Sequence, residues 1–296
     1  HRDLHSFPTR RSSDLSKATI VHIDIDRSSI GKSVHAHLGV HGDVRQALEA
    51  VWPLVKEAEH AEWTEQVNRW KERFPFAYPQ QRDAIMPQYL IEQIYEVSKG
   101  QAVVTTDVGQ HQMWATQFFC YTRPRNFISS GGLGTMGFGL PACIGAQLGR
   151  KGELNVCITG DGGVQMNFQE LVVAVEHKLP IVVVIVNNTY LGMVRQWQEL
   201  FYGKRYTGVM LSQHSRGANE HIGEAPVYLP DFVKMAEAHG ACARRIKKPE
   251  EVAPALEEAF KSGKTWVIEC IVEPEANVFP MIPPGSHVAE MINRTV

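Results

Sequence analysis

The chain has 296 residues, of which 44% are hydrophobic and 21% are charged, and these proportions exclude disorder over most of its length. The net charge of −2 argues against a general nucleic-acid binder. The longest apolar run, residues 181–186, is too short to cross a bilayer.

Residues 1–15 have neither helical nor strand periodicity, and we expect them to be a non-native leader rather than an organellar transit peptide. Residues 18–25 are rich in β-branched side chains and predict a buried strand. Apolar side chains recur at helical spacing over residues 43–55 and predict a helix. Residues 57–84 are polar and aromatic, which indicates a linker with a helix in it.

From residue 85 to residue 296, helices and strands alternate in a second, larger unit. Pro87 begins a predicted helix that Gly100 closes, and the glycine-rich segment 129–149 turns into another helix. Strand–helix–strand order implies parallel pairing, so the expected fold class is α/β, with a doubly wound, mostly parallel sheet. The expected strands are residues 102–106, 154–159, 181–186, 241–246 and 265–272.

Three polar loops, residues 107–111, 160–163 and 187–193, follow strands of this predicted sheet at the end where ligands bind in open parallel sheets. Asp161 stands between glycines after the strand 154–159, and Asn188 follows the strand 181–186. A carboxylate, an amide oxygen and a backbone carbonyl, completed by diphosphate oxygens, suit Mg²⁺. Either of the last two loops alone is more often a plain turn, but together they predict a metal and diphosphate site.

The segment from Gly160 to Asn188 resembles the signature of thiamine-diphosphate enzymes, Gly-Asp-Gly followed about 25 residues later by Asn-Asn. TDVGQHQMW, SGGLGTMGFGLPA, LGMVRQW and PMIPPG are similar to segments of the acetohydroxyacid synthase (acetolactate synthase) family. The resemblance runs from about Lys17 onward and corresponds to the C-terminal half of the catalytic subunit. It implies a thiamine-diphosphate-binding domain at 85–296, preceded at 16–56 by the remnant of an α/β FAD-binding domain.

The resemblance implies that Asp161, Asn188 and the main-chain carbonyl of Tyr190 hold Mg²⁺. Met136 matches the apolar wedge that bends the cofactor, and Met193 and Trp197 match residues of the substrate channel. Contacts to thiamine diphosphate are implied for Gln110, His111, Gly134, Met136, Gly160, Asp161, Gly162, Gly163, Asn188, Tyr190, Gly192 and Met193.

FAD is the third cofactor that the resemblance implies, and it takes no net redox part in the family's reaction. The matching positions are Asp24, Ile25, Asp43, Val44, Gly131 and Gly132. A turn-capping role for the two aspartates stays open, because most of that domain is missing from the chain. His35, His37 and His41 have no carboxylate or cysteine at metal-site spacing, and we expect them to be solvated.

For the intact parent, the resemblance implies decarboxylation of pyruvate and carboligation to a second pyruvate or to 2-ketobutyrate, in branched-chain amino-acid (isoleucine and valine) biosynthesis. The family's catalytic glutamate lies in an N-terminal domain that this chain lacks, so we expect the chain alone to be inactive. A homodimer or tetramer, a regulatory small subunit and a cytoplasmic location (plastid or mitochondrion in a eukaryote) are also implied. No nucleic-acid or membrane partner is expected.

Two alternative functions stay open at this point. Another thiamine-diphosphate enzyme, such as pyruvate oxidase, would share the same cofactor signature. An NAD-dependent dehydrogenase is the more distant alternative, because residues 132–137 match G-x-G-x-x-G and Asp161 follows 24 residues after Gly137. The dehydrogenase reading leaves Asn187 and Asn188 unexplained.

Overall fold

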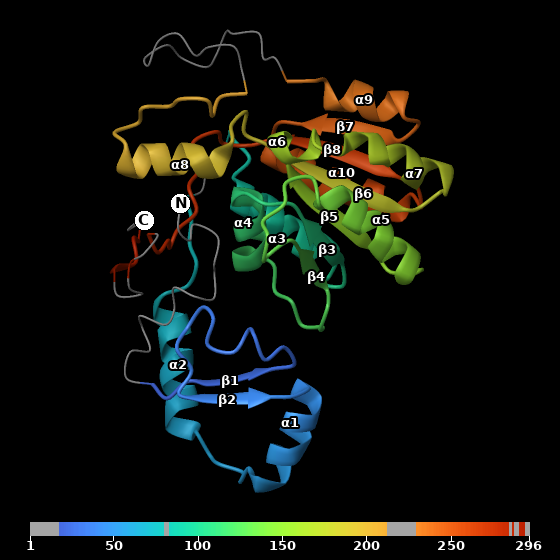
Figure 1. Cartoon of the computed structure of the whole chain (residues 1–296). Helices are drawn as coiled ribbons and strands as arrows, with labels where there is room; N and C mark the ends of the chain where they lie inside the picture. The colour runs from blue at the N-terminus through green and yellow to red at the C-terminus, as the bar shows by residue number, and fades with distance from the viewer. Residues whose placement is uncertain (1–17, 80–82, 212–228, 284–285, 287–289, 294–296) are drawn as a thin grey trace. The chain divides into compact units, whose positions relative to one another are not determined.

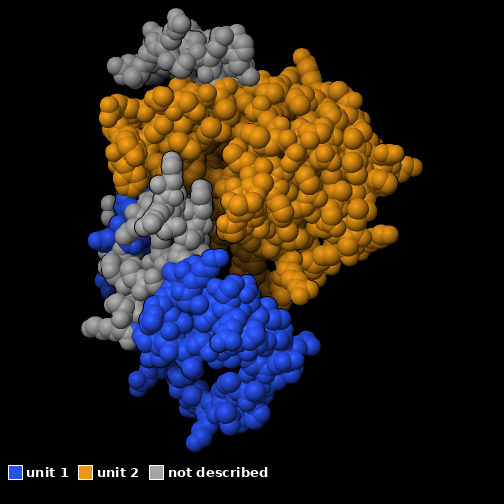
Figure 2. All heavy atoms as spheres, in the orientation of Figure 1, with its two compact units in different colours: residues 1–77, 279–295 blue, residues 78–278, 296 orange. Residues whose placement is uncertain are grey.

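A computed structural model of the chain describes residues 18–79, 83–211, 229–283, 286 and 290–293. The chain divides into two compact units, which Figure 2 shows in different colours. The first unit comprises residues 1–77 and 279–295, and the second is essentially residues 78–278. Among the described residues, no helix is long and apolar enough to cross a membrane.

The first unit contains a two-stranded parallel sheet and two α-helices. Strand β1 (Val21–Asp24) pairs with β2 (Leu38–His41). The other elements are α1 (Val44–Val51), the 3₁₀ helix η2 (Trp52–Leu54) and α2 (Ala61–Arg73). The predicted strand and both helices are therefore present.

The prediction that β1 is buried is wrong. Val21 is 51% exposed and Ile25, just after the strand, is 69% exposed. In the described part of this unit, no residue of α1 or α2 is buried. A sheet of two strands, beside helices that bury no residue, has too little packing to shield its side chains. Its β-branched residues therefore stay accessible although they form a regular strand.

The second unit is built on a six-stranded, fully parallel sheet in the order β4-β3-β5-β6-β8-β7 (Figure 1). This confirms the expected α/β class. The strands are β3 (Val103–Thr106), β4 (Phe127–Ser129), β5 (Asn155–Gly160), β6 (Ile181–Asn187), β7 (Cys242–Ile246) and β8 (Trp266–Ile271).

Helices cover both faces of this sheet. One face packs against α3 (Pro87–Val97), α4 (Gln110–Phe118) and α10 (Pro249–Lys261). The other packs against α5 (Gly139–Gly149), α7 (Leu171–Glu176) and α9 (Phe232–Ala238). Alternate residues of β6 enter the two cores, which is why its sequence is apolar without interruption.

The chain reverses direction across the sheet between β3 and β5. The connection from β3 runs through α4 to β4 at the edge, whereas the connection from β5 runs through α6 (Asp161–Val164), the 3₁₀ helix η3 (Phe168–Glu170) and α7 to β6 on the other side. The two loops leave toward opposite faces and open a crevice at the carboxyl ends of the strands. The fold thus places the loops after Thr106 and Gly160 beside a ligand-binding crevice.

Candidate cofactor site

A cavity of about 240 Å³ lies at this crevice, among the loops that follow β3, β5 and β6. The sequence reasoning assigned twelve residues to the cofactor, and every one of them lines this cavity. They come from four stretches of the chain: Gln110 and His111; Gly134 and Met136; Gly160, Asp161, Gly162 and Gly163; Asn188, Tyr190, Gly192 and Met193. The fold therefore gathers segments that are up to 83 residues apart in the sequence, from Gln110 to Met193.

Asp161 is the buried carboxylate of the cavity. It begins α6 and is 2% exposed, and its Oδ1 accepts a hydrogen bond from the Gly162 N–H at 2.9 Å. Its Oδ2 is buried and has no hydrogen-bond partner among the described residues. Burial raises the pKa of Asp161 to about 7, although the backbone N–H groups of Gly162 and Thr189 act to lower it. Such a carboxylate is suited to a bound cation, which would offset the cost of its buried charge.

Asn188 lines the cavity, and both ends of its side-chain amide are hydrogen-bonded. Its Oδ1 accepts from the Tyr190 N–H at 3.1 Å, and its Nδ2 donates to Gln110 Oε1 at 3.2 Å. Tyr190 is 4% exposed, so its backbone is held in a buried turn. In the described part of the chain, no three His, Cys, Asp or Glu side chains group as metal ligands. An ion here would therefore need amide and carbonyl oxygens besides Asp161, which is the donor set that Mg²⁺ accepts.

His111 is the second buried group with an unsatisfied atom. It is 6% exposed, and its Nε2 has no hydrogen-bond partner within the described residues. Burial lowers the pKa of His111 to about 4, against the opposing charge of Asp107. The ring is therefore neutral at physiological pH.

Asp107 is a buried carboxylate next in sequence to Val108, which lines the cavity, and the sequence analysis gave it no role. It is 1% exposed at the end of β3 and accepts hydrogen bonds from Thr159 Oγ1, at 2.6 Å, and from the Gly139 N–H. A Cβ at Gly163 would overlap Asp107 Oδ2. Asp107 thus joins β3, β5, α5 and α6 beneath the cavity. Its position at the end of a strand could have indicated a role, but its hydrogen-bond partners are 32 and 52 residues away in the sequence and could not be predicted.

Of the three apolar residues predicted around the cofactor and the substrate, the two methionines line the cavity and Trp197 does not. Met136 and Met193 both line the cavity, and Met136 Cε lies 3.7 Å from where a Cβ on Gly162 would be. Trp197 is half-buried on α8 (Gly192–Phe201), four residues from Met193, as the helical spacing predicted. Trp197 is not among the described residues that line this cavity.

Comparison with known proteins decides which family uses this arrangement. The family described as "Thiamine pyrophosphate enzyme, C-terminal TPP binding domain" matches residues 107–270, which include all three loops of the cavity. The chain belongs to the thiamine pyrophosphate enzymes. Thiamine pyrophosphate is the same compound as thiamine diphosphate, so this confirms the resemblance at the level of the family.

Among the relatives of the chain are acetolactate synthases, of which three are compared with it below. The chain is 39% identical to the acetolactate synthase isozyme 3 large subunit of Escherichia coli, over 96% of the chain and 50% of the relative. It is 37% identical to the isozyme 2 large subunit of the same organism (94% and 47%) and 38% identical to acetolactate synthase 1, chloroplastic, of Zea mays (94% and 43%). The chain spans about half the length of the curated relatives it matches.

The strand order also separates this thiamine pyrophosphate enzyme from the dehydrogenase alternative. In a dinucleotide-binding fold, the acidic residue follows the strand that neighbours the glycine-loop strand. Here the glycine loop follows β4, whereas Asp161 follows β5, and β3 lies between them. The G-x-G-x-x-G match at 132–137 is therefore not a dinucleotide fingerprint.

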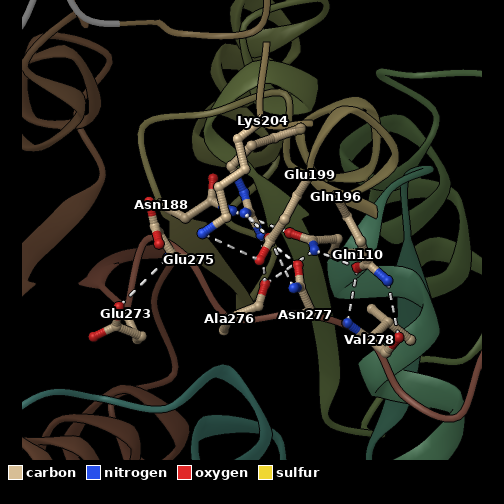
Figure 3. Close-up of polar contacts among 11 residues, drawn as sticks. Gln110, Asn188, Gln196, Glu199, Lys204, Glu273, Glu275, Ala276, Asn277 and Val278 are labelled. Carbon is tan, nitrogen blue, oxygen red and sulfur yellow. Dashed lines mark hydrogen bonds and ion pairs between the residues drawn. The ribbon is translucent and has the colours of Figure 1, made fainter. Parts of the chain in front are cut away.

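Arg195 on α8 is a buried cation beside the site. Its side chain is fully buried and bonds Glu199 at 2.7 Å, Asn277 Oδ1 at 2.6 Å and the Ala276 carbonyl at 3.1 Å. Its guanidinium also lies over the ring of Tyr190, 5.7 Å from the centroid. Figure 3 shows Glu199, Asn277 and Ala276 converging at this point. Arg195 thus ties α8 to the segment after β8.

The positions predicted to contact FAD have ordinary structural partners in their own surroundings. Asp24 Oδ1 accepts from the Asp26 N–H at 2.8 Å, and Asp43 caps α1 by accepting from the Arg45 N–H at 2.9 Å. Ile25 and Val44 are exposed. No described atom lies within 4 Å of a Cβ built on Gly131 or Gly132. These six positions stay a prediction for FAD.

His35, His37 and His41 are exposed, as expected. His37 Nδ1 accepts from the Ile20 N–H at 3.0 Å, and His41 Nε2 lies 3.0 Å from the Ile25 carbonyl oxygen. The rings of His35 and His37 meet edge to face, with centroids 5.6 Å apart. These contacts join the ends of β1 and β2 and leave no metal-like grouping among the described side chains.

The pH dependence of stability should report the buried state of His111. Because burial lowers the pKa of His111 from 6.5 to about 4, the unfolded chain binds a proton more readily than the folded chain between these values. The contribution of His111 to stability is therefore constant above pH 6.5 and falls by about 3 kcal/mol as the pH drops to 4. Urea unfolding at pH 7.5 and 4.5 should show that this loss is absent from His111→Gln, so that the variant's stability decreases less, or increases more, than that of the unmodified protein. His177→Gln, at an exposed position, should change with pH as the unmodified protein does; equal changes in all three proteins would contradict the burial of His111.

Gly192 should not tolerate a side chain. A Cβ there would overlap Gln110 Oε1 and lie 2.7 Å from Asn188 Nδ2. We expect Gly192→Ala to lower the free energy of unfolding by about 1–3 kcal/mol, measured with urea. Gly145→Ala is the control, because a Cβ on this α5 glycine meets no described atom within 4 Å, and it should be neutral or stabilising. A neutral Gly192→Ala would contradict the close approach.

Proposed function

We propose that this chain is the cofactor-binding half of an acetolactate synthase catalytic subunit. The observation that carries the proposal is the cavity at the sheet crevice, where all twelve assigned residues meet around Asp161 and its unpartnered Oδ2. Identities of 37–39% to acetolactate synthase large subunits of Escherichia coli support the same activity. The cofactor would be thiamine diphosphate, as in the matched family.

Mg²⁺ would be held at the crevice by Asp161, Asn188 and the main-chain carbonyl of Tyr190. The donor set fits, because it offers one carboxylate and two neutral oxygens and leaves further positions for diphosphate oxygens. The unpartnered Asp161 Oδ2 and the raised pKa of this carboxyl both favour a cation at this place. Gly160, Gly162 and Gly163 carry no side chains that would keep a diphosphate from the backbone.

The remaining side chains of the cavity would orient the cofactor and the substrate. Met136 would be the apolar contact of the bent cofactor, and the neutral ring of His111 would contact its diphosphate end. Met193 would face the substrate, with Trp197 farther along the same helix face. When bound, thiamine diphosphate supplies the carbanion chemistry for decarboxylating one 2-keto acid and joining its remainder to another.

The first unit and the ends of the chain complete the proposal. Residues 16–56 would be the remnant of a FAD-binding domain, with FAD in a structural role near Asp24, Ile25, Asp43, Val44, Gly131 and Gly132. Residues 57–84 would be the linker and residues 85–296 the cofactor-binding domain. The leader, residues 1–15, lies outside the described residues.

The whole protein would act on pyruvate and 2-ketobutyrate, as a homodimer or tetramer with a possible regulatory small subunit. Its catalytic glutamate would come from the N-terminal half that the curated relatives have in addition. A cytoplasmic location, or a plastid or mitochondrion in a eukaryote, belongs to the same proposal.

A chimera tests the proposed activity. The chain, from residue 17, is joined to the N-terminal half of the Escherichia coli isozyme 3 large subunit, and acetolactate formed from pyruvate is measured. We expect activity that needs thiamine diphosphate and Mg²⁺ and that Asp161→Asn abolishes. A folded chimera that binds the cofactor but forms acetate or no acetolactate would contradict the assignment and favour another thiamine-diphosphate enzyme. Quenching of tryptophan fluorescence by NADH but not by thiamine diphosphate would contradict the cofactor itself.

A further inference from the structure

Three buried side-chain amides form a chain from the end of β6 to the segment after β8 (Figure 3). Gln196 Oε1 accepts from the Val278 N–H at 2.8 Å, and Gln196 Nε2 donates to the Val278 carbonyl at 2.9 Å. Gln110 Nε2 donates to Gln196 Oε1 at 2.8 Å and to the Ala276 carbonyl at 3.0 Å. Asn188 Nδ2 donates to Gln110 Oε1 at 3.2 Å. Each of the three amides is at most 6% exposed.

The backbone of Val278 determines which end of each amide, oxygen or nitrogen, faces its neighbour. A backbone N–H can only donate and a carbonyl can only accept, so Gln196 fits Val278 in one orientation of its amide. Gln196 Oε1 and the Ala276 carbonyl can both only accept hydrogen bonds, so Gln110 must turn its Nε2 toward them. This leaves Gln110 Oε1 for Asn188, which must present its Nδ2. Reversing any one amide would set like atoms against each other in a buried place, at a cost of about 1–3 kcal/mol per unmet group.

The two hydrogens of Gln110 Nε2 are both taken by protein acceptors. The Gln110 side chain therefore has no hydrogen left to donate to a phosphate oxygen, since Oε1 can only accept. A direct side-chain contact between Gln110 and a diphosphate does not fit this arrangement. Its amide serves Asn188 instead.

We propose that Gln110 and Gln196 are positioning residues that hold Asn188 with its oxygen, rather than its nitrogen, toward the metal site. The inference rests on the proposed function, because the need for an oxygen comes from Mg²⁺. Without Gln110, the one described group that would still hold the amide is the Tyr190 N–H, which donates to Asn188 Oδ1 at 3.1 Å. An amide held on one side alone would present its NH₂ group for part of the time, and NH₂ does not bind this ion. Gln196 does not line the cavity, so its influence would pass through Gln110.

A double-mutant cycle separates this role from general support of the fold. In Asn188→Asp, both side-chain ends are oxygens, so either can face the metal site, and the oxygen beside Gln110 Oε1 meets an acceptor that Gln110→Met removes. The Mg²⁺ concentration for half-saturation is measured at fixed thiamine diphosphate by the fluorescence of the chain, in which Trp114 lines the cavity. We expect Gln110→Met to raise this concentration about 10-fold or more, as for other residues that orient metal ligands, and Gln196→Met to raise it less, because Ala276 still holds Gln110.

In the Asn188→Asp background, Gln110→Met should leave the Mg²⁺ concentration unchanged or lower it. An equal rise in both backgrounds, or no rise with Asn188 in place, would overturn the inference while leaving the proposed function intact. Gln112→Met is the matched control on the same helix, because its amide bonds Ser129 Oγ at 2.6 Å and it does not line the cavity; it should leave the Mg²⁺ requirement unchanged. Absence of Mg²⁺-dependent binding by the unmodified chain would instead contradict the proposed function, and the inference with it.

A second measurement, which needs no ligand, reports the orientation of the Asn188 amide directly. It can also be made on variants that are too unstable for the binding titration. Hydrogen exchange at the side-chain amide of Asn188, followed by ¹⁵N NMR, should be slow in the unmodified chain, because Nδ2 is buried and bonded to Gln110. Gln110→Met should make it faster, and Gln112→Met should not. Equally slow exchange in Gln110→Met would show that Asn188 keeps its orientation unaided and would overturn the inference.

Discussion

Asp161→Asn is expected to weaken Mg²⁺-dependent binding of thiamine diphosphate by about 100-fold or more, which equals about 2.7 kcal/mol. The reason is that Asp161 supplies the only negative charge among the proposed metal ligands, and its Oδ2 is buried without a partner among the described residues. Isothermal titration of the chain with thiamine diphosphate, with Mg²⁺ and with EDTA, measures the effect. Unchanged binding would place the metal elsewhere.

The same substitution should not destabilise the protein, which separates loss of the site from loss of the fold. The pKa of Asp161 is raised from 3.8 to about 7 by burial, so the folded chain holds a proton that the unfolded chain releases between these values. The ionised carboxylate therefore lowers stability progressively from pH 4 to pH 7, by about 4 kcal/mol at full effect. In EDTA at pH 8, Asp161→Asn should be at least as stable as the unmodified protein, and the difference should vanish near pH 4. A variant that is less stable at pH 8 would contradict this account of the carboxylate.

Arg195→Met is expected to lower the free energy of unfolding by about 3 kcal/mol, the largest loss of stability that we predict for a single substitution. The substitution removes three hydrogen-bond donations from a fully buried guanidinium and leaves Glu199, at 19% exposure, without its closest cation. Burial opposes the ionisation of Glu199, but hydrogen bonds from Asn277 and Arg195 outweigh it and lower the pKa of this carboxyl. Urea unfolding at pH 7 measures the change.

Arg244→Met is the matched control for Arg195→Met. Arg244 pairs with Glu258 at a similar distance, 2.8 Å, but both side chains are more than 40% exposed. Such a pair contributes less than about 1 kcal/mol. The double variant Arg195→Met/Glu199→Met should recover part of the lost stability, because no buried charge is then left unpaired. Equal losses in Arg195→Met and Arg244→Met would contradict a structural role for the buried pair.

Five of the six strands of the parallel sheet in the second unit were predicted from the sequence, whereas β4, a three-residue strand at the edge, was not. β6 is apolar throughout, and its two faces enter two separate cores. The helix α4 was not predicted. Its buried side includes Gln110 and His111, which face the cavity, so the usual apolar periodicity is missing. The apolar spacing from Phe168 to Leu179 predicts one helix that Pro180 ends, but the structure has the 3₁₀ helix η3 and the short helix α7 there.

The candidate site was predictable where its residues stand in short motifs at strand ends, as Asp161 and Asn188 do. Arg195 was not predictable in this way. A charged side chain is expected at the surface, and only partners distant in sequence make burial acceptable. For Arg195 these partners are Ala276 and Asn277, 81 and 82 residues away.

A crystal structure of the chain with thiamine diphosphate and Mn²⁺ in place of Mg²⁺ would test the central claim most directly, because anomalous scattering locates the manganese. We predict one anomalous peak at the crevice between β3, β5 and β6, about 2.1 Å from a carboxylate oxygen of Asp161, from Asn188 Oδ1 and from the Tyr190 carbonyl oxygen, with diphosphate oxygens among the remaining ligands. A peak bound to other residues, or an Asn188 amide turned away from the ion, would contradict it.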